Sequence, residues 1–97
     1  MTDFELSLPD DFDKYAWELK SKGWYDHAVM SCKGNKYKLS FYDPVRLAQE
    51  IQNELSSVDA FLEDNLVVIN TIDRSCMEKA VKYLALTGRY KSLQKMT

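Results

Sequence analysis

The side chains that could do chemistry in this chain are few, and their spacing keeps them apart. His27 is the only histidine of the 97-residue sequence, and Cys32 is the nearest thiol. If both lie on one strand, their five-residue separation places them roughly 16 Å apart on opposite faces of a sheet. They cannot then share a metal ion, so the sequence predicts no metal site.

The second thiol, Cys76, falls in the first turn of a predicted helix, a position that can favour reactive thiolates. It also lies on the apolar side of that helix, so we expect a buried, reduced and unreactive side chain. Gly23, Gly34 and Gly88 occur at predicted helix ends and a turn, which leaves no glycine-rich loop to bind phosphate. We therefore expect no cofactor and no enzymatic activity.

Trp17 is the residue whose position suggests binding. A helix beginning near Asp10 or Asp11 would bury a stripe made of Phe12, Tyr15, Ala16 and Leu19. Trp17 lies about 140° from Phe12 around that helix, on a side shared with Asp10, Asp13 and Ser21. An exposed tryptophan among carboxylates is typical of a protein interface, although the first strand or the C-terminal tail could also cover it.

The overall charge limits the classes of partner. The formal net charge is −2 and the pI is about 5.3, which argues against general affinity for nucleic acid or membranes. Residues 1–18 hold six acidic residues and one lysine, whereas residues 73–97 hold six basic and two acidic residues. This asymmetry favours a charged partner, but ordinary solvated surfaces would produce the same pattern.

Composition and length predict one cytoplasmic domain spanning residues 1–97. Hydrophobic residues make up 45% of the chain, as in ordinary globular proteins. No apolar run approaches the roughly 18 residues needed to cross a bilayer, and the acidic N-terminal region lacks the layout of a signal peptide. Two cysteines do not make a disulfide scaffold.

The clearest structural unit is the stretch 36–55, in which a strand leads into a helix. Tyr37, Leu39 and Phe41 alternate with polar residues, as in a strand with one buried face. Asp43-Pro44 then predicts a helix start, with the carboxylate as cap and proline in the first turn. The helix repeats apolar residues at helical spacing: Val45, Leu47, Ala48, Ile51 and Leu55.

The remaining elements follow from similar patterns. We predict strands over 4–8, 24–32 and 66–69, a hairpin turn centred on Gly34-Asn35, and a short extra strand over 58–62. The continuous apolar run 66–69 is typical of a strand buried in the middle of a sheet. A last helix begins at Asp73 or Ser75, with Ser75 and Glu78 spaced as a capping box, and ends at Gly88. The polar tail 89–97 is expected to fray.

This order predicts an α/β (α+β) two-layer sandwich. The ferredoxin-like arrangement βαββαβ with an additional C-terminal helix is the leading topology. The core is predicted to contain Tyr37, Leu39, Phe41, Leu47, Ile51, Val67, Ile69, Val81 and Leu84.

The segments FYDPVRLAQEIQNEL and NLVVINTIDRSCMEKAV, together with the size and acidic pI, resemble the small α/β immunity proteins of bacterial toxin systems. These include the antidotes of contact-dependent growth inhibition. The resemblance implies a stoichiometric inhibitor, a monomer or weak dimer, that binds a cognate toxin domain such as a nuclease. The surface expected to bind that partner contains Asp10, Asp13, Trp17 and Ser21.

Three other functions fit the same sequence, one of which is a subunit of a larger complex. A small regulatory or ligand-binding module of ferredoxin-like type could act as a dimer. RNA binding would use Tyr37 and Phe41 to stack bases, but these residues form one continuous apolar face with Leu39, which we expect helices to cover.

Overall fold

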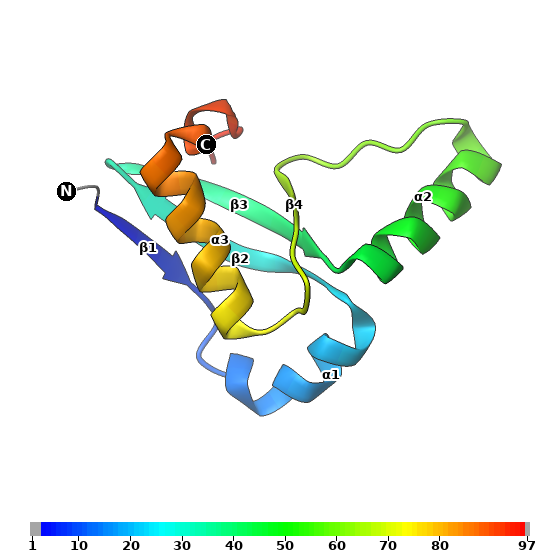
Figure 1. Cartoon of the computed structure of the whole chain (residues 1–97), viewed down its shortest axis with the longest axis horizontal. Helices are drawn as coiled ribbons and strands as arrows, with labels where there is room; N and C mark the ends of the chain where they lie inside the picture. The colour runs from blue at the N-terminus through cyan, green and yellow to red at the C-terminus, as the bar shows by residue number, and fades with distance from the viewer. Residues whose placement is uncertain (1–2, 97) are drawn as a thin grey trace.

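The computed structural model describes residues 3–96 and shows a mixed α+β fold with a four-stranded sheet and three α-helices (Figure 1). The predicted order of elements, a strand and helix, a hairpin, a helix and strand, and a final helix, is confirmed. The elements are β1 (Phe4–Ser7), a 3₁₀ turn (Phe12–Tyr15), α1 (Ala16–Lys22), β2 (Trp24–Cys32), β3 (Asn35–Tyr42), α2 (Pro44–Val58), β4 (Leu66–Val68), α3 (Arg74–Thr87) and a second 3₁₀ turn (Arg89–Ser92).

The strand order is β1-β2-β3-β4, with antiparallel pairing except between β3 and β4, which are parallel. The ferredoxin-like order is therefore not confirmed. That order would place another strand between β1 and β2, whereas here the segment between them returns the chain directly beside β1. Phe4 then lies opposite Cys32, and Ser7 lies opposite Val29.

The hairpin between β2 and β3 is present, but its turn is one residue earlier than predicted. Lys33 and Gly34 occupy its two central positions, both with positive φ (50° and 83°), and Cys32 pairs with Asn35. Two positive φ values characterise the turn that matches the twist of adjoining strands. Glycine suits the second position because it has no Cβ to clash.

One face of the sheet holds the core. Its buried side chains include Ala28, Met30, Cys32, Tyr37, Leu39 and Phe41. A bulge between Tyr25 and Ala28 allows both residues to face this core despite their odd spacing. α3 covers the face from the β1 side through its buried residues Met77, Val81 and Ala85. We call this the helix-covered face.

The predicted helix starts at Asp43 and Asp73 are capped by those side chains, whereas Asp11 precedes the 3₁₀ turn without a side-chain cap hydrogen bond. The Asp43 carboxylate accepts a 2.7 Å hydrogen bond from the Arg46 amide, and Pro44 occupies the first turn, as predicted. Asp73 caps α3 by accepting a 2.8 Å bond from the Cys76 amide. The Ser75 capping box is wrong because Ser75 already lies inside the helix.

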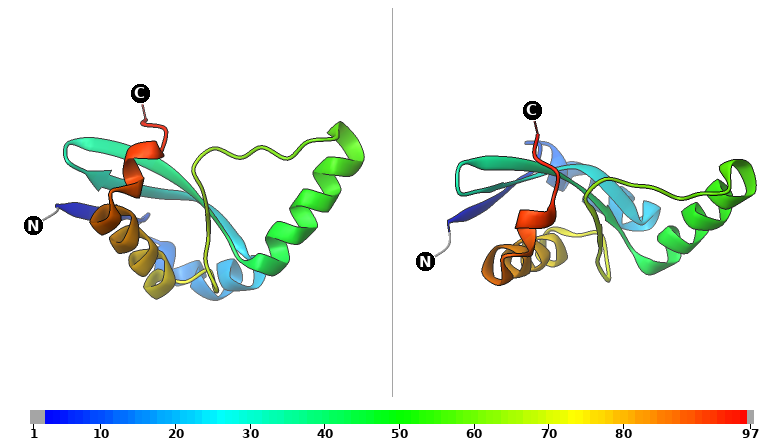
Figure 2. Two further views of the ribbon diagram at one scale, coloured as in Figure 1. Left: turned by 45° about the horizontal axis from the view of Figure 1, so that its top comes forward. Right: turned by 90° about the horizontal axis from the view of Figure 1, so that it is seen from above.

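The largest departure from prediction is α2, which projects from the body of the molecule in every view (Figures 1 and 2). None of its residues is buried. Leu47 and Ile51 are half-buried, so their assignment to the core is wrong. Other predicted core residues are confirmed: Val81 is buried, and Val67 and Leu84 pack against the core. The radius of gyration, 13.8 Å, exceeds the roughly 12.5 Å expected of a compact chain of this length.

Two further expectations fail. The segment 58–62 forms no strand, because α2 continues through Val58 before an extended link returns to β4. The tail does not fray within the described residues: Tyr90 is buried against Tyr37, and the Met96 amide donates to the Lys36 carbonyl at 2.8 Å. The last residue, Thr97, lies outside the described residues.

Candidate functional site

Trp17 lies on α1 with 71% of its surface exposed, so neither the tail nor the first strand covers it. Ser21 follows one turn later, is also exposed, and shares the same side of the helix. Ala16 and Leu19, on the other side, pack against the core. Gly23 ends α1 with φ of +78°, a value that glycine adopts without strain. The short helix is thus fixed with its tryptophan facing outward.

The two aspartates predicted beside Trp17 lie before α1. Asp10 is exposed in the turn that precedes the 3₁₀ segment, and Asp13 is exposed within that segment. The helix type changes at Tyr15, so the uniform 100° per residue that grouped Asp13 with Trp17 does not apply. Tyr15 itself is 42% exposed, contrary to its assignment to the buried stripe.

Asp13 contacts α3. Its carboxylate accepts a 3.2 Å hydrogen bond from the guanidinium of Arg74, and that guanidinium lies 5.3 Å from the centre of the buried Phe12 ring. The Asp13 side chain is nevertheless 78% exposed and can still meet a partner. The structure therefore places Trp17 and Ser21 on one helix face, with Asp10 and Asp13 on the adjoining segment.

The groups considered for chemistry are dispersed. His27 is exposed, with Nε2 3.4 Å from the carboxylate of Asp26, while Cys32 is buried on the helix-covered face. Cys76 is half-buried, which corrects the expectation that it is fully buried. Across residues 3–96, no group of three or more histidine, cysteine, aspartate or glutamate side chains is arranged to hold a metal ion.

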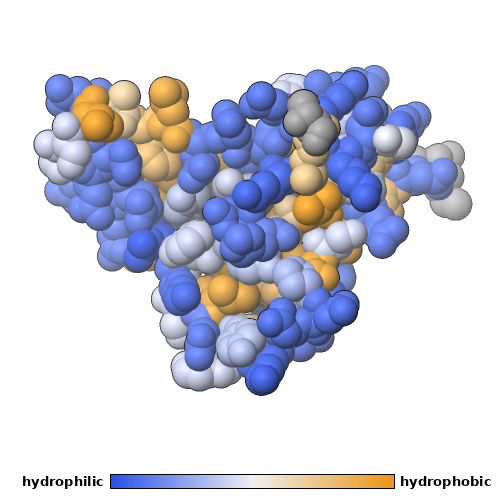
Figure 3. Space-filling model, turned by 180° about the vertical axis from the view of Figure 1, so that it is seen from behind, coloured by the Kyte–Doolittle hydropathy of each residue, from blue (hydrophilic) through white to orange (hydrophobic). Residues whose placement is uncertain are grey.

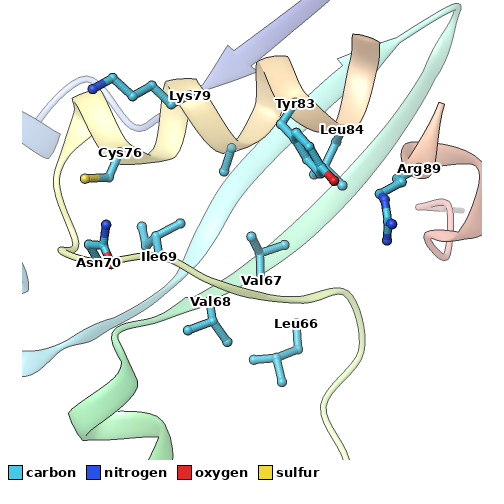
Figure 4. Close-up of a pocket in the computed structure, with 11 residues that line it drawn as sticks. Leu66, Val67, Val68, Ile69, Asn70, Cys76, Lys79, Tyr83, Leu84 and Arg89 are labelled. Carbon is cyan, nitrogen blue, oxygen red and sulfur yellow. The ribbon is translucent and has the colours of Figure 1, made fainter. Parts of the chain in front are cut away.

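A groove of about 530 Å³ lies between α3 and the edge strand β4 (Figure 4). Val67 and Ile69 point from the strand toward the helix, where Tyr83 and Leu84 face them, whereas Val68 points away. The full lining is Leu66, Val67, Val68, Ile69, Asn70, Cys76, Lys79, Ala80, Tyr83, Leu84 and Arg89. Apolar side chains dominate this list, and its two charged members are both cations.

Sequence reasoning missed this groove because it assigned the run 66–69 to the middle of the sheet. β4 is instead an edge strand of three residues in which Leu66 and Val68 are 36% and 47% exposed. The detectable signal was the brevity of the run, since a short strand is typical of a sheet edge.

Hydrogen bonds hold the link between α2 and β4 to the sheet. The hydroxyl of Tyr42 donates to the carboxylate of Glu63 at 2.8 Å. Burial raises the pKa of Tyr42, and the carboxylate of Glu63 raises it further. The Asn65 amide donates to the Lys38 carbonyl at 2.9 Å and accepts from the Gln94 amide at 2.8 Å. The returning chain is therefore attached to β3 and to the tail.

Comparison of the chain with models of protein families, with curated proteins and with solved structures found no match. Within residues 3–96, no helix combines the length and apolar character that a membrane span requires.

Proposed function

We propose that this chain acts by binding another protein, as a stoichiometric inhibitor of a cognate bacterial toxin domain. Its contact surface includes Trp17 and Ser21 on α1 together with Asp10 and Asp13. The observation that carries the proposal is the exposure of Trp17, 71%, on a helix that is fixed by its opposite face.

Leaving an indole in water is unfavourable. A tryptophan can bury up to about 250 Å² of surface. At about 25 cal/mol per Å², burying the exposed portion of Trp17 would contribute roughly 4 kcal/mol of hydrophobic free energy. A partner that covers it recovers part of this energy. Asp10 and Asp13 add negative charge, which would speed association with a basic partner and select against acidic ones.

RNA binding is less well supported. Tyr37 and Phe41, the aromatic residues that would stack bases, are 2% and 0% exposed. A dimeric regulatory module has one specific observation in its favour, the apolar surface of α2, which is 70% exposed at Val45 and 62% exposed at Val58.

The test uses the C-terminal toxin domain of the large secreted protein encoded next to this gene, if one is encoded there. Isothermal titration should show a 1:1 ratio of chains, and co-expression should protect cells from the toxin domain. Trp17→Ala should weaken binding by roughly 30-fold or more while leaving the unfolding free energy nearly unchanged. Val45→Ala, an equally exposed position on α2, is the matched control and should bind like wild type.

Asp10→Lys should mainly slow association, and the effect should shrink at high salt because ions screen exposed charges. Wild-type affinity in Trp17→Ala would exclude this surface. Absence of both binding and protection with the adjacent toxin domain would exclude the proposed function.

A further inference from the structure

α2 carries an apolar stripe that is covered only in part: Leu47 and Ile51 are half-buried, whereas Leu55 and Val58 are exposed. The stripe consists of Leu47, Ala48, Ile51, Leu55 and Val58, which fall within roughly 100° of arc on the helix. Leu55 is 46% exposed, Val58 is 62% exposed, and Leu62 just beyond the helix is 91% exposed. Figure 3, which views the molecule from behind, shows apolar side chains gathered near the free end of this projection. We call residues 44–62 the α2 arm.

The start of the arm is fastened to the body. The Asp43 amide donates a 2.8 Å hydrogen bond to the Gly23 carbonyl, and a Cβ on Gly23 would lie only 2.8 Å from the Cβ of Arg46. Arg46 in turn pairs with Glu50 at 2.6 Å. The link that returns from the arm to β4 is held by the bond between Glu63 and Tyr42. Swinging the arm onto its own groove would strain or break the Asp43–Gly23 and Tyr42–Glu63 hydrogen bonds, whereas the Arg46–Glu50 pair lies within the helix and would move with it.

The groove between α3 and β4 has an apolar lining that suits such a helix. α3 packs on the β1 side of the helix-covered face, and β4 forms the opposite edge of the sheet. Tyr83 on α3 is 55% exposed, and Val67 on β4 is half-buried. Leu39 and Phe41 on β3 are already buried, so an added helix would pack along the β4 edge of the sheet.

The charges of the two surfaces are complementary. The arm carries Glu50, Glu54 and Asp59 against Arg46, and Glu54 lies beside the apolar stripe. The groove lining contains Lys79 and Arg89 and no acidic residue. An apolar stripe bordered by acids therefore matches an apolar groove bordered by bases, and both surfaces occur on the same chain.

We propose that two copies of this chain associate by reciprocal exchange, with the α2 arm of each copy lying in the groove between α3 and β4 of the other. Two identical contacts related by a two-fold axis close the assembly as a dimer. Each arm adds a helix beside the partner's α3, along the edge formed by β4. This inference rests on surfaces separate from Trp17 and does not depend on the toxin-inhibitor proposal.

The first test measures the mass of the purified protein by sedimentation equilibrium over roughly 1 to 500 μM, since mass action controls dimerisation. Wild type should become dimeric within this range. Leu55→Asp places an unpaired charge in both contacts and should raise the dimer dissociation constant at least about 100-fold. Asn53→Asp adds the same charge on the polar side of α2 and should leave dimerisation nearly unchanged.

The second test exchanges charges between the surfaces. Glu54→Lys alone, and Lys79→Glu with Arg89→Glu, should each weaken self-association about 10-fold because both contacts become repulsive. Mixing the two variants should restore dimerisation. In the mixed dimer, the arm with the Glu54→Lys change meets the groove with the Lys79→Glu and Arg89→Glu changes, so the reversed charges attract. The other contact joins a wild-type arm to a wild-type groove.

Three results would overturn the proposal. Wild type could remain monomeric throughout the concentration range, which would mean that a different protein covers the arm or that the arm folds onto its own groove. Leu55→Asp and Asn53→Asp could dimerise equally well, or the mixed charge variants could fail to associate.

Discussion

The position of α2 can be tested through the stability of the isolated chain, with Ile51→Ala as the perturbation. Ile51 is half-buried, and α2 contains no buried residue. α2 shares few contacts with the other helices and strands, so in the monomer this change removes only part of a side-chain burial, and it gains a few tenths of a kcal/mol in helix propensity. We therefore expect the free energy of unfolding to fall by about 1 kcal/mol.

Leu39→Ala provides the reference for a buried site. Leu39 is 0% exposed at the centre of the helix-covered face, and truncating such a residue costs about 2–5 kcal/mol. The two variants remove apolar atoms of similar volume. The difference between their losses of unfolding free energy therefore measures how much more the rest of the chain buries Leu39 than Ile51.

Urea unfolding at about 1 μM, followed by tryptophan fluorescence, keeps the protein monomeric and gives both values. A loss of 2 kcal/mol or more in Ile51→Ala would show that α2 packs against its own chain, and the reasoning about the arm would then be refuted. A small effect at low concentration with weaker dimerisation at high concentration would support it.

Three more predictions concern the caps and thiols. Asp73→Ala should lower stability by about 1 kcal/mol at neutral pH. The amide of Cys76 holds the pKa of Asp73 below its usual value, so this contribution is complete above about pH 4 and is lost as the pH falls further; urea unfolding from pH 2 to 7 should show the two proteins converging in acid. Gly23→Ala should cost more than about 1 kcal/mol in the same assay, because φ is +78° and the new Cβ would lie 2.7 Å from an Asp43 carboxylate oxygen. A thiol reagent should modify Cys76 faster than Cys32, which is 2% exposed, and peptide mass mapping of timed samples can measure both; equal rates would contradict the assigned burial.

Local features of the fold were predictable because local chemistry determines them. The Asp43-Pro44 helix start, the left-handed ends at Gly23 and Gly88, and the alternating burial of residues 36–39 each depend on a few neighbouring residues. The alternation stops there, because Ser40 and Tyr42 are buried as well as Phe41. The sequence placed Trp17 off the apolar stripe but left open whether other segments cover it, and the structure shows it 71% exposed. The change from 3₁₀ to α-helix at Tyr15 was not predictable, since one periodicity was assumed throughout.

The arrangement of the elements depended on contacts that the pattern does not encode. An apolar run such as Leu66–Ile69 has the same sequence whether the strand is central or at an edge. An apolar stripe on a helix likewise shows that something covers it, but it does not identify the partner. Leu47 and Ile51 were therefore assigned to the core, although they are only half-buried, and Val45 was included in the stripe although it is 70% exposed.

The two exposed surfaces of this chain use different residues and can therefore act at the same time. The groove lining does not include Trp17, Ser21, Asp10 or Asp13, and the arm begins only after Gly23 has ended α1. Exchange of arms would leave both copies of Trp17 exposed, so a dimer would present two α1 surfaces to a partner. If a toxin domain instead separated the dimer, it would have to displace the arm from the groove, and its apparent affinity would then fall as the concentration of this chain rose.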